Sequence, residues 1–364
     1  MRVFAPGLCG YSPSESVIVY RMKALVLKEY HRFALEDVPL PNLGPDEVLV
    51  AVKACGICGS DVHGMDGSTG RRRPPIIMGH EAAGVIDRVG DNVKEWLPGD
   101  RVTFDSTLYC GHCFYCRQGN INLCDNRRVM GVSCEEYRQP GAFAEYVAVP
   151  QRVLYWLPDS LSYERAAMVE ALAIAFHAVH RTPVALNDTA VVIGAGMIGL
   201  LVMQALRLAG CGRIIAVDQA KDRLALAEKM GVTEILDSAK TDVVTEVFQR
   251  TKGRGADLAV EAVGINATVD MAFHAVRKGG HVTLVGNVTP KVELPLQVAV
   301  TRELTVSGSC ASRGEYPACL EMMARGAINV DPCLSAVAPL SEGAAWFDRL
   351  YRKEAGLLKV LLTP

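Results

Sequence analysis

The sequence predicts an α/β chain in which a doubly wound parallel sheet is inserted into a barrel-like β domain. Two observations predict it. Short alternating runs such as "VLVAVKAC" and "AFAEYVAVP" recur between Gly, Pro and Asp over residues 48–155, which is typical of short strands joined by turns. Apolar runs such as "TAVVIGAG" and "RIIAVD" then alternate with helical stretches such as "MIGLLVMQALRLAG" over 166–286, which is typical of a parallel sheet.

These patterns divide the chain into four segments. After the pattern of the parallel sheet, isolated strands such as "ELTVSGS" and "LLKVLLTP" follow, and we expect this tail to rejoin the first domain. The leader has no extended apolar core, so we expect it not to be a targeting signal. The predicted segments are an N-terminal extension over 1–21, the β domain over 22–165 with a cysteine lobe over 110–124, the parallel-sheet domain over 166–304, and a returning segment over 305–364.

Composition excludes several classes of protein. The chain has 364 residues, half of them apolar and about a fifth charged, so it can bury one or two full cores without disulfides. A formal charge of −2 gives no basis for binding nucleic acid or an anionic membrane. No apolar run approaches the roughly 20 residues of a spanning helix, and scattered single cysteines suit a reducing compartment. We therefore expect a soluble cytoplasmic protein.

Four cysteines lie close together in "CGHCFYCRQGNINLC". Two residues separate Cys110 from Cys113 and Cys113 from Cys116, and seven separate Cys116 from Cys124. One loop can wrap such sulfurs around a tetrahedral Zn²⁺ with no position left open, which predicts a structural zinc site. An iron–sulfur cluster and free thiols are the alternatives.

A glycine-rich turn follows the first strand of the predicted parallel sheet. In "TAVVIGAGMIGLLVMQALRLAG", Gly194, Gly196 and Gly199 lie between an apolar strand and an amphipathic helix. This context predicts a tight turn that brings backbone amides and a helix N-terminus to a pyrophosphate. The alternative is a glycine turn in a fold that binds no nucleotide.

The choice of dinucleotide depends on Asp218, which ends the next strand. A carboxylate there accepts hydrogen bonds from the ribose hydroxyls and repels a 2′-phosphate, so NAD is favoured over NADP. Lys221 and Arg223 are nearby, but neither directly follows the aspartate. The predicted cofactor-binding residues are Gly194, Gly196, Met197, Ile198, Gly199, Asp218 and Arg223.

A second metal site is indicated by "ACGICGSDVHG" and "IIMGHEAAGVI". Cys58, His80 and Glu81 supply sulfur, nitrogen and oxygen donors, which a catalytic zinc accepts while one position stays open. Each residue alone has an ordinary structural explanation, since a lone cysteine packs as a small hydrophobe and a lone histidine is commonly hydrogen-bonded.

From Met22 to Pro364 the chain resembles the zinc-dependent medium-chain alcohol and polyol dehydrogenases. The resemblance rests on "CGICGSDVHG", "GHEAAG", the four-cysteine lobe, "GAFAEYV", "VEALAIAFHAV" and "VIGAGMIG", in family order. It implies a GroES-like catalytic barrel, an inserted Rossmann domain and a cleft between them. It also implies hydride transfer from a secondary alcohol or polyol to NAD, two zinc ions per subunit, one catalytic and one structural, and a homo-oligomer, dimer or tetramer.

Site residues follow from the same resemblance. Cys58 and His80 match zinc ligands, and Glu81 matches a glutamate that ligates zinc in polyol-type members and supports it in others. Glu170, in "VEALAIAFHAV", stands where ethanol-type members have a cysteine, which places the chain in the polyol branch. An exposed carboxylate at a helix start is the alternative for Glu170.

The resemblance also implies a route for the proton. Ser60 matches a hydroxyl relay, and His63 matches the histidine that passes the proton to solvent. Asp61 matches a carboxylate that orients the histidine ligand.

Substrate recognition departs from the pattern of sorbitol dehydrogenases. Gly64, Ala311 and Ser312 replace a tyrosine and an arginine–tyrosine pair, which argues against sorbitol itself. The run Arg71, Arg72 and Arg73 raises a phosphorylated polyol such as galactitol 1-phosphate, although a solvated basic loop is favoured.

Other activities remain as alternatives. Small vicinal diols are a further substrate class. A non-catalytic NAD-binding relative and a zinc-free quinone-reductase-like enzyme are disfavoured by the combined ligand and relay residues.

Overall fold

The structure is a computed structural model that describes residues 20–134 and 137–364. Most of the predicted N-terminal extension lies outside the described residues. Its last residue, Arg21, already belongs to strand β1 (Arg21–Glu29).

A seven-stranded sheet forms the core of the first domain. Its strands run in the order β12-β6-β5-β3-β20-β19, and β11 also pairs with β3. Alternate buried positions of these strands pack into one apolar cluster. The seven strands are β3 (Glu47–Ile57), β5 (Glu81–Val89), β6 (Arg101–Phe104), β11 (Tyr146–Pro150), β12 (Leu154–Trp156), β19 (Leu334–Pro339) and β20 (Lys359–Thr363).

Smaller sheets flank this core. Strand β1 pairs with both β2 and β4, and two further pairs are β7 with β8 and β9 with β10. Their bounds are β2 (Arg32–Pro39), β4 (Ile76–Ile77), β7 (Thr107–Leu108), β8 (Arg128–Val129), β9 (Ser133–Cys134) and β10 (Tyr137–Arg138).

A six-stranded parallel sheet forms the second domain in the order β15-β14-β13-β16-β17-β18. Strands β13 and β16 are buried at every position, as expected for strands covered on both faces. This is the doubly wound order that places a nucleotide at the point where strand order reverses, and the predicted fold class is confirmed. The strands are β13 (Thr189–Ile193), β14 (Arg213–Asp218), β15 (Glu234–Asp237), β16 (Ala256–Glu261), β17 (Val276–Leu284) and β18 (Thr305–Gly308).

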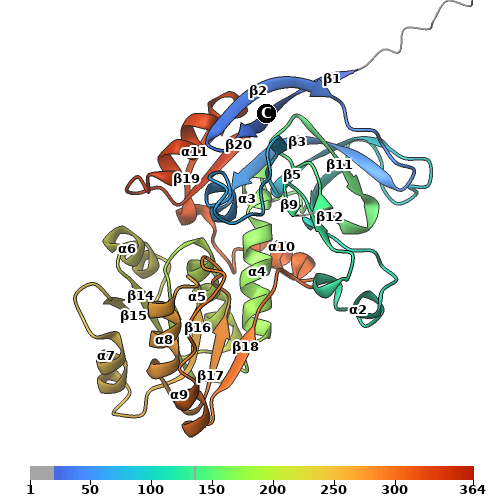
Figure 1. Ribbon diagram of the computed structural model, residues 1–364. Helices are drawn as coiled ribbons and strands as arrows, with labels where there is room; N and C mark the ends of the chain where they lie inside the picture. The colour runs from blue at the N-terminus through green and yellow to red at the C-terminus, as the bar shows by residue number, and fades with distance from the viewer. Residues whose placement is uncertain (1–19, 135–136) are drawn as a thin grey trace, which may run out of the picture.

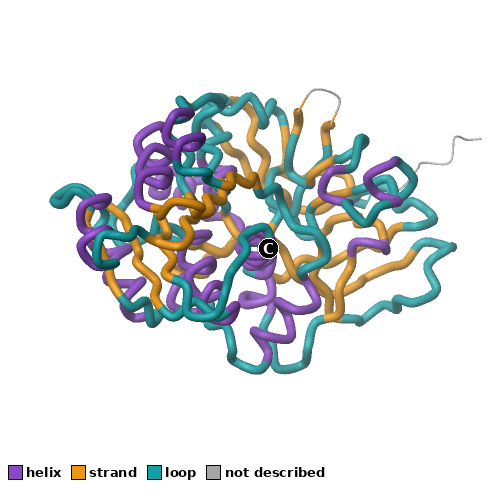
Figure 2. The backbone as a smooth tube through the Cα atoms, turned by 90° about the horizontal axis from the view of Figure 1, so that it is seen from below, coloured by secondary structure: helices purple, strands orange, loops and turns teal. Residues whose placement is uncertain are grey.

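Helices concentrate in the half of the molecule that holds the parallel sheet, whereas strands and loops make most of the other half (Figure 2). None of the helices in the described part of the chain combines the length and apolar character needed to cross a membrane. The helices are α1 (Gly59–Val62), α2 (Phe114–Arg117), α3 (Tyr163–Ala167), α4 (Val169–His180), α5 (Met197–Ala209), α6 (Lys221–Lys229), α7 (Val243–Arg250), α8 (Asn266–Ala275), α9 (Leu296–Thr301), α10 (Tyr316–Ala324) and α11 (Gly343–Tyr351). Short 3₁₀ turns are η1 (Ile121–Leu123), η2 (Gln151–Val153), η3 (Asp331–Cys333) and η4 (Leu340–Glu342).

One strand lies in a different domain from the one predicted. The sequence pattern assigned "ELTVSGS" to the segment that returns to the first domain, yet β18 pairs in parallel with β17 and is the edge of the parallel sheet. The return happens later, through β19 and β20, and β20 pairs antiparallel with β3. An edge strand is half exposed, so its composition resembles that of an isolated strand.

The two domains share helix α4, which runs between them in Figure 1, with α10 beside it. Apolar side chains from α4, α5 and α10 form one buried cluster. The chain ends in the same half as the N-terminal strands (Figure 1), which brings the last strand beside the first candidate zinc ligand.

Candidate active site and zinc centres

Strand register gathers the first set of donors. Cys58 follows β3, and Glu81 begins β5. Gly56 pairs with Glu81 across the two strands, so the end of β3 lies beside His80 and Glu81. One ligand atom from each of Cys58, His80 and Glu81 lies within 4.8 Å of the other two. A thiol, an imidazole and a carboxylate so placed fit a zinc ion with a position left open.

Glu170 lies in the first turn of α4 and is not part of this 4.8 Å group. Its carboxylate is not the exposed group of the alternative reading, because its Oε2 atom is buried and has no hydrogen-bond partner among the described residues. Burial raises the pKa of Glu170 to about 8, and Glu81 adds to the rise whereas His80 opposes it. An unpartnered buried oxygen that interacts electrostatically with His80 and Glu81 has the chemistry of a further metal ligand.

Asp61 contacts one candidate ligand beside each of the two strands, His80 before β5 and Cys58 after β3. Its Oδ1 atom lies 3.5 Å from Nδ1 of His80, an ion-pair distance at which Nδ1 makes no hydrogen bond to the described residues, and Nε2 of that ring remains for a metal. Its Oδ2 atom accepts a hydrogen bond of 3.4 Å from the backbone N–H of Cys58. Burial disfavours the charged carboxylate, but His80 and Arg72 outweigh it and hold the pKa of Asp61 well below its usual range.

The solvated-loop interpretation of the arginine run is wrong for its middle residue. Arg72 is 2% exposed, whereas Arg71 and Arg73 are exposed. The Arg72 guanidinium pairs with Asp61 at 2.8 Å. A charged partner inside the fold drew this arginine inward, and a single sequence does not reveal such a partner.

Lys359 is a site residue that the sequence reasoning missed. It begins β20, is 2% exposed, and donates from Nζ to Oε2 of Glu81 at 2.5 Å and to the carbonyl oxygen of Ile57 at 3.2 Å. Burial lowers the pKa of Lys359, but Glu81 and Cys58 outweigh burial and raise it. The available signal was a lone lysine in the apolar run "LLKVLL", because lysine is almost never fully buried without a partner.

Ser60 and His63 occupy the short helix α1 and its end. The Ser60 side chain is exposed, and its Oγ lies 3.5 Å from Nε2 of His80. His63 is exposed as well. The structure therefore brings Ser60 to the donor cluster and leaves His63 in contact with solvent.

The dinucleotide turn has the expected geometry. Gly194 has φ +98°, and a Cβ on Gly199 would lie 1.8 Å from the carbonyl oxygen of Gly194, so neither position admits a side chain without rearrangement. Helix α5 begins directly afterwards with Met197 and Ile198, both partly exposed. Backbone amides and a helix N-terminus are thus available to a pyrophosphate.

Asp218 lies at the end of β14 beside this turn. Its carboxylate accepts hydrogen bonds from the backbone N–H groups of Ala195 at 2.8 Å and Ala220 at 2.9 Å. Arg223 places Nη1 3.9 Å from Oδ2 of Asp218 and is 43% exposed at its side chain. The backbone bonds hold the carboxylate in place, so it is oriented before any ribose binds.

The four lobe cysteines converge as predicted. Their sulfurs lie within 4.8 Å of one another, and none is joined in a disulfide. The sulfurs of Cys110 and Cys116 are 4.0 Å apart, close to the roughly 3.8 Å edge of a tetrahedron with Zn–S bonds of about 2.3 Å. Backbone hydrogen bonds, first from His112 and then from Cys113, lower the pKa of Cys110 to about 5, which favours a thiolate ligand.

Hydrogen bonds tie this lobe to the cofactor-side helices. Asn122 donates from Nδ2 to the carbonyl oxygen of Cys310 at 2.8 Å and lies 3.3 Å from Nε2 of His177. Nδ1 of His177 and Nδ1 of His180 lie 2.9 and 3.2 Å from Oε1 of Glu315. Burial opposes ionisation of Glu315, but these histidines and the backbone N–H of Arg313 lower its pKa to about 2.

The departures in substrate recognition have structural counterparts. Gly64 is buried, and a Cβ there would lie 2.4 Å from Cγ of Arg72, so the arginine stem occupies the space beside it. Ser312 is buried and donates to Oδ2 of Asp105 at 3.2 Å. Burial raises the pKa of Asp105 to about 6.

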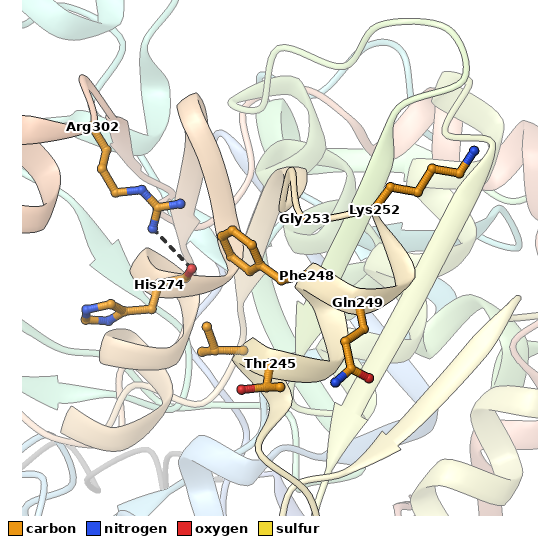
Figure 3. A pocket seen from close by; sticks show the side chains of 8 residues that line it. Thr245, Phe248, Gln249, Lys252, Gly253, His274 and Arg302 are labelled. Carbon is orange, nitrogen blue, oxygen red and sulfur yellow. Dashed lines mark hydrogen bonds between the residues drawn. The ribbon is translucent and has the colours of Figure 1, made fainter.

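A separate hollow lies between α7 and α8 (Figure 3). Arg302 there donates to the carbonyl oxygens of His274 and Val276, and its guanidinium lies 5.6 Å from the ring centroid of Phe248. These contacts close the end of α8, and the lining contains none of the zinc or dinucleotide residues. The hollow is not part of the candidate active site.

Comparison with known proteins identifies both halves of the chain. Residues 44–159 match the alcohol dehydrogenase GroES-like domain, and residues 198–325 match the zinc-binding dehydrogenase family. The expected barrel and the expected inserted nucleotide-binding domain are thereby confirmed.

Relatives match over nearly the full length. The chain is 34% identical to sorbitol dehydrogenase of Bacillus subtilis over 94% of this chain and 97% of that protein. It is 35% identical to D-arabitol-phosphate dehydrogenase of Enterococcus avium over 92% of this chain and 94% of that protein. The solved structure of a zinc-binding dehydrogenase from Sinorhizobium meliloti bound to NADP matches with a TM-score of 0.87 and 33% identity, over 95% of this chain and 100% of that one. The chain therefore belongs to the zinc-dependent medium-chain dehydrogenases, in the polyol branch of that family.

Proposed function

We propose that this protein oxidises a secondary hydroxyl of a polyol or vicinal diol and transfers the hydride to NAD⁺. The observation that carries the proposal is the convergence of Cys58, His80 and Glu81 beside the Ser60 hydroxyl, in a chain that also holds the glycine turn of a dinucleotide site. Zinc, when bound, supplies a Lewis acid that lowers the pKa of a substrate hydroxyl, and nicotinamide supplies the hydride acceptor.

In this proposal Cys58, His80 and Glu170 hold the catalytic zinc. Glu81 either completes the shell or supports it, since Lys359 already donates to its Oε2 atom. The cysteines of the lobe, Cys110, Cys113, Cys116 and Cys124, hold a second zinc that closes the loop and takes no part in the reaction.

Ser60 accepts the proton of the substrate hydroxyl. Its Oγ lies beside Nε2 of His80, where a hydroxyl held near the metal ligands is within reach. His63, exposed at the end of α1, passes the proton to water. The chain thus separates the group that meets the substrate from the group that meets solvent.

NAD is the proposed cofactor. The reason is Asp218, which two backbone N–H groups hold in place. It presents a carboxylate to the adenosine ribose and repels a 2′-phosphate. Arg223 is close to this carboxylate and exposed, and this feature favours NADP as the second candidate. NADP is the cofactor bound in the structure of the Sinorhizobium meliloti relative.

An unphosphorylated substrate is proposed because the middle arginine of "GRRRPP" is already used. Arg72 is paired with Asp61 inside the fold and offers nothing to a phosphate. Arg71 and Arg73 remain exposed, and they support a phosphorylated polyol as the second candidate. The relative that acts on D-arabitol phosphate keeps this candidate open.

We also propose a homo-oligomer and a cytoplasmic location. Strand β18 is a sheet edge with Val306 39% exposed, and helix α9 before it exposes Leu296 and Val300 by 65% and 66%. An uncovered apolar edge of this kind is suited to pairing with a second copy.

A substrate panel tests the proposal. Sorbitol, xylitol, galactitol, 2,3-butanediol and the 1-phosphates of galactitol and arabitol are each offered with NAD⁺ and with NADP⁺, and nicotinamide reduction is followed by absorbance. Turnover of at least one unphosphorylated polyol or diol with NAD⁺ is expected. No turnover by zinc-replete protein with any of them would overturn the proposal.

A further inference from the structure

We propose that Arg72 is a positioning residue that holds the His80 ring and the Ser60 hydroxyl in place through its contacts with Asp61 and Ser60. The inference rests on the proposed catalytic zinc site. It concerns a residue that is not one of the proposed ligands and that contacts Asp61 and Ser60.

The contact between Arg72 and Asp61 is a fork. Nη2 and Nε of Arg72 donate to the same oxygen, Oδ1 of Asp61, at 2.8 and 3.3 Å. The side chains are 3% and 0% exposed, so water does not compete for these bonds. A planar guanidinium holds an oxygen in a fixed direction in a way that a lysine ammonium does not.

Asp61 transmits this constraint to two candidate ligands. The oxygen that Arg72 holds is the one that faces Nδ1 of His80 at 3.5 Å. The other oxygen accepts from the backbone N–H of Cys58. If Arg72 were absent, a fully buried carboxylate would lose a cationic partner and keep His80 as the other, and it would turn from the ring or draw in water.

Arg72 also reaches the proposed proton acceptor directly. Its Nη2 atom lies 3.4 Å from Oγ of Ser60, which in turn lies 3.5 Å from Nε2 of His80. The guanidinium therefore contacts the hydroxyl as well as the Asp61 carboxylate. Gly64 makes this position possible, because any side chain there would collide with the Arg72 stem.

The sequence supplies matched controls. Arg71, Arg72 and Arg73 are consecutive, and only the middle one is buried. Arg73→Met removes the same charge from the same loop without touching Asp61, so it separates the loss of a charge from the loss of the fork.

The experiment measures metal binding and its geometry before activity. Zinc per subunit is counted for wild type, Arg72→Lys, Arg72→Met and Arg73→Met, and affinity is measured by competition with a chelator. The catalytic site is also loaded with Co²⁺ for its visible absorption spectrum. Turnover and KM are then measured with the polyol that the panel identifies, and thermal unfolding checks the fold.

Arg72→Met is expected to bind the catalytic zinc about 10- to 100-fold more weakly, as is typical when a group behind a metal-ligating histidine is lost. Its cobalt spectrum should shift, kcat should fall more than KM rises, and the four-cysteine zinc should stay. Arg72→Lys should lie between Arg72→Met and wild type, and Arg73→Met should match wild type in zinc affinity and cobalt spectrum.

Wild-type zinc affinity, cobalt spectrum and kcat in Arg72→Met would overturn the inference. If Arg72→Met fails to fold, Arg72→Lys decides, because a positioning role requires a shifted cobalt spectrum and weaker zinc in a folded lysine variant. Wild-type protein that binds only one zinc would instead remove the proposed function, so the two failures are distinguishable.

Discussion

Glu315→Gln tests the link between α4, the loop before α10 and the cysteine lobe. Glu315 accepts from both His177 and His180, and its side chain is 3% exposed. The wild-type contacts lower the pKa of Glu315 from 4.5 to about 2, which corresponds to about 3 kcal/mol of stability at about 1.4 kcal/mol per tenfold change. Glutamine keeps the shape of the side chain and removes its charge.

The pH dependence follows from the direction of that shift. A carboxyl with a depressed pKa in the folded state stabilises the fold fully above its unfolded pKa, near 4.5, and loses this contribution as pH falls towards 2. At pH 6 the free energy of unfolding of the wild type should therefore exceed that of Glu315→Gln by up to about 3 kcal/mol. This difference should shrink by about 1.4 kcal/mol by pH 3.5, because the unfolded wild type then takes up a proton.

Urea unfolding followed by far-ultraviolet circular dichroism, at pH values from 7 to 3.5, measures both quantities. Glu321→Gln is the matched control, since Glu321 is an exposed carboxylate on the next helix, and it should change the unfolding free energy little at any pH. A wild-type advantage that stays constant between pH 6 and 3.5, or a control that behaves like Glu315→Gln, would refute the reasoning.

Three further predictions concern the metals, the cofactor and the proton. Cys113→Ser should lose one zinc and mainly lower the unfolding temperature, whereas Cys58→Ser should abolish turnover in a protein that still folds. Metal analysis that finds one zinc in untreated, fully active wild type would contradict the assignment of two zinc sites. Asp218→Ala should weaken discrimination against NADP⁺, as the ratio of kcat/KM for the two cofactors will show, and a wild type that already prefers NADP⁺ contradicts it. Ser60→Ala should lower turnover by about 10² to 10⁴ with zinc retained. His63→Ala should lower turnover less, by a factor that changes across the pH range of histidine titration. Near-wild-type turnover in zinc-replete Ser60→Ala would contradict the proton relay.

Residue type and short spacing were enough to predict the donors. The sulfurs of the lobe lie within one loop, and their spacing allows them to meet, as they do in the structure. Cys58 and His80 are separated by 21 residues between them, but both flank strands that pair, and the family motifs around them were recognisable. The end of the parallel-sheet domain was placed too early, before β18. The other domain limits, the roles of Ser60 and His63, and the participation of Glu170 stay predictions.

Other parts of the site depended on tertiary packing that no local pattern contains. Arg72 looks like a surface cation in sequence, and the lone lysine in "LLKVLL" indicates a buried partner for Lys359 without identifying it. Only the fold shows that each meets a buried carboxylate. Strand β18 was placed in the returning segment because an exposed edge strand lacks the apolar run of its buried neighbours. In each case the missing information was the partner, which is distant along the chain.

The buried charges around the first donor cluster argue for a divalent cation on physical grounds. In the metal-binding forms of the ligands, with Cys58 a thiolate and His80 neutral, two cationic side chains there face four acidic ones, so two negative charges remain uncompensated. Burial of an uncompensated charge is costly, and the raised pKa of Glu170 is the sign of that cost in the metal-free arrangement. A bound Zn²⁺ would supply the two missing positive charges and would give the unpartnered Oε2 atom of Glu170 a cation to coordinate. The six groups in this balance are Cys58, Asp61, Arg72, Glu81, Glu170 and Lys359.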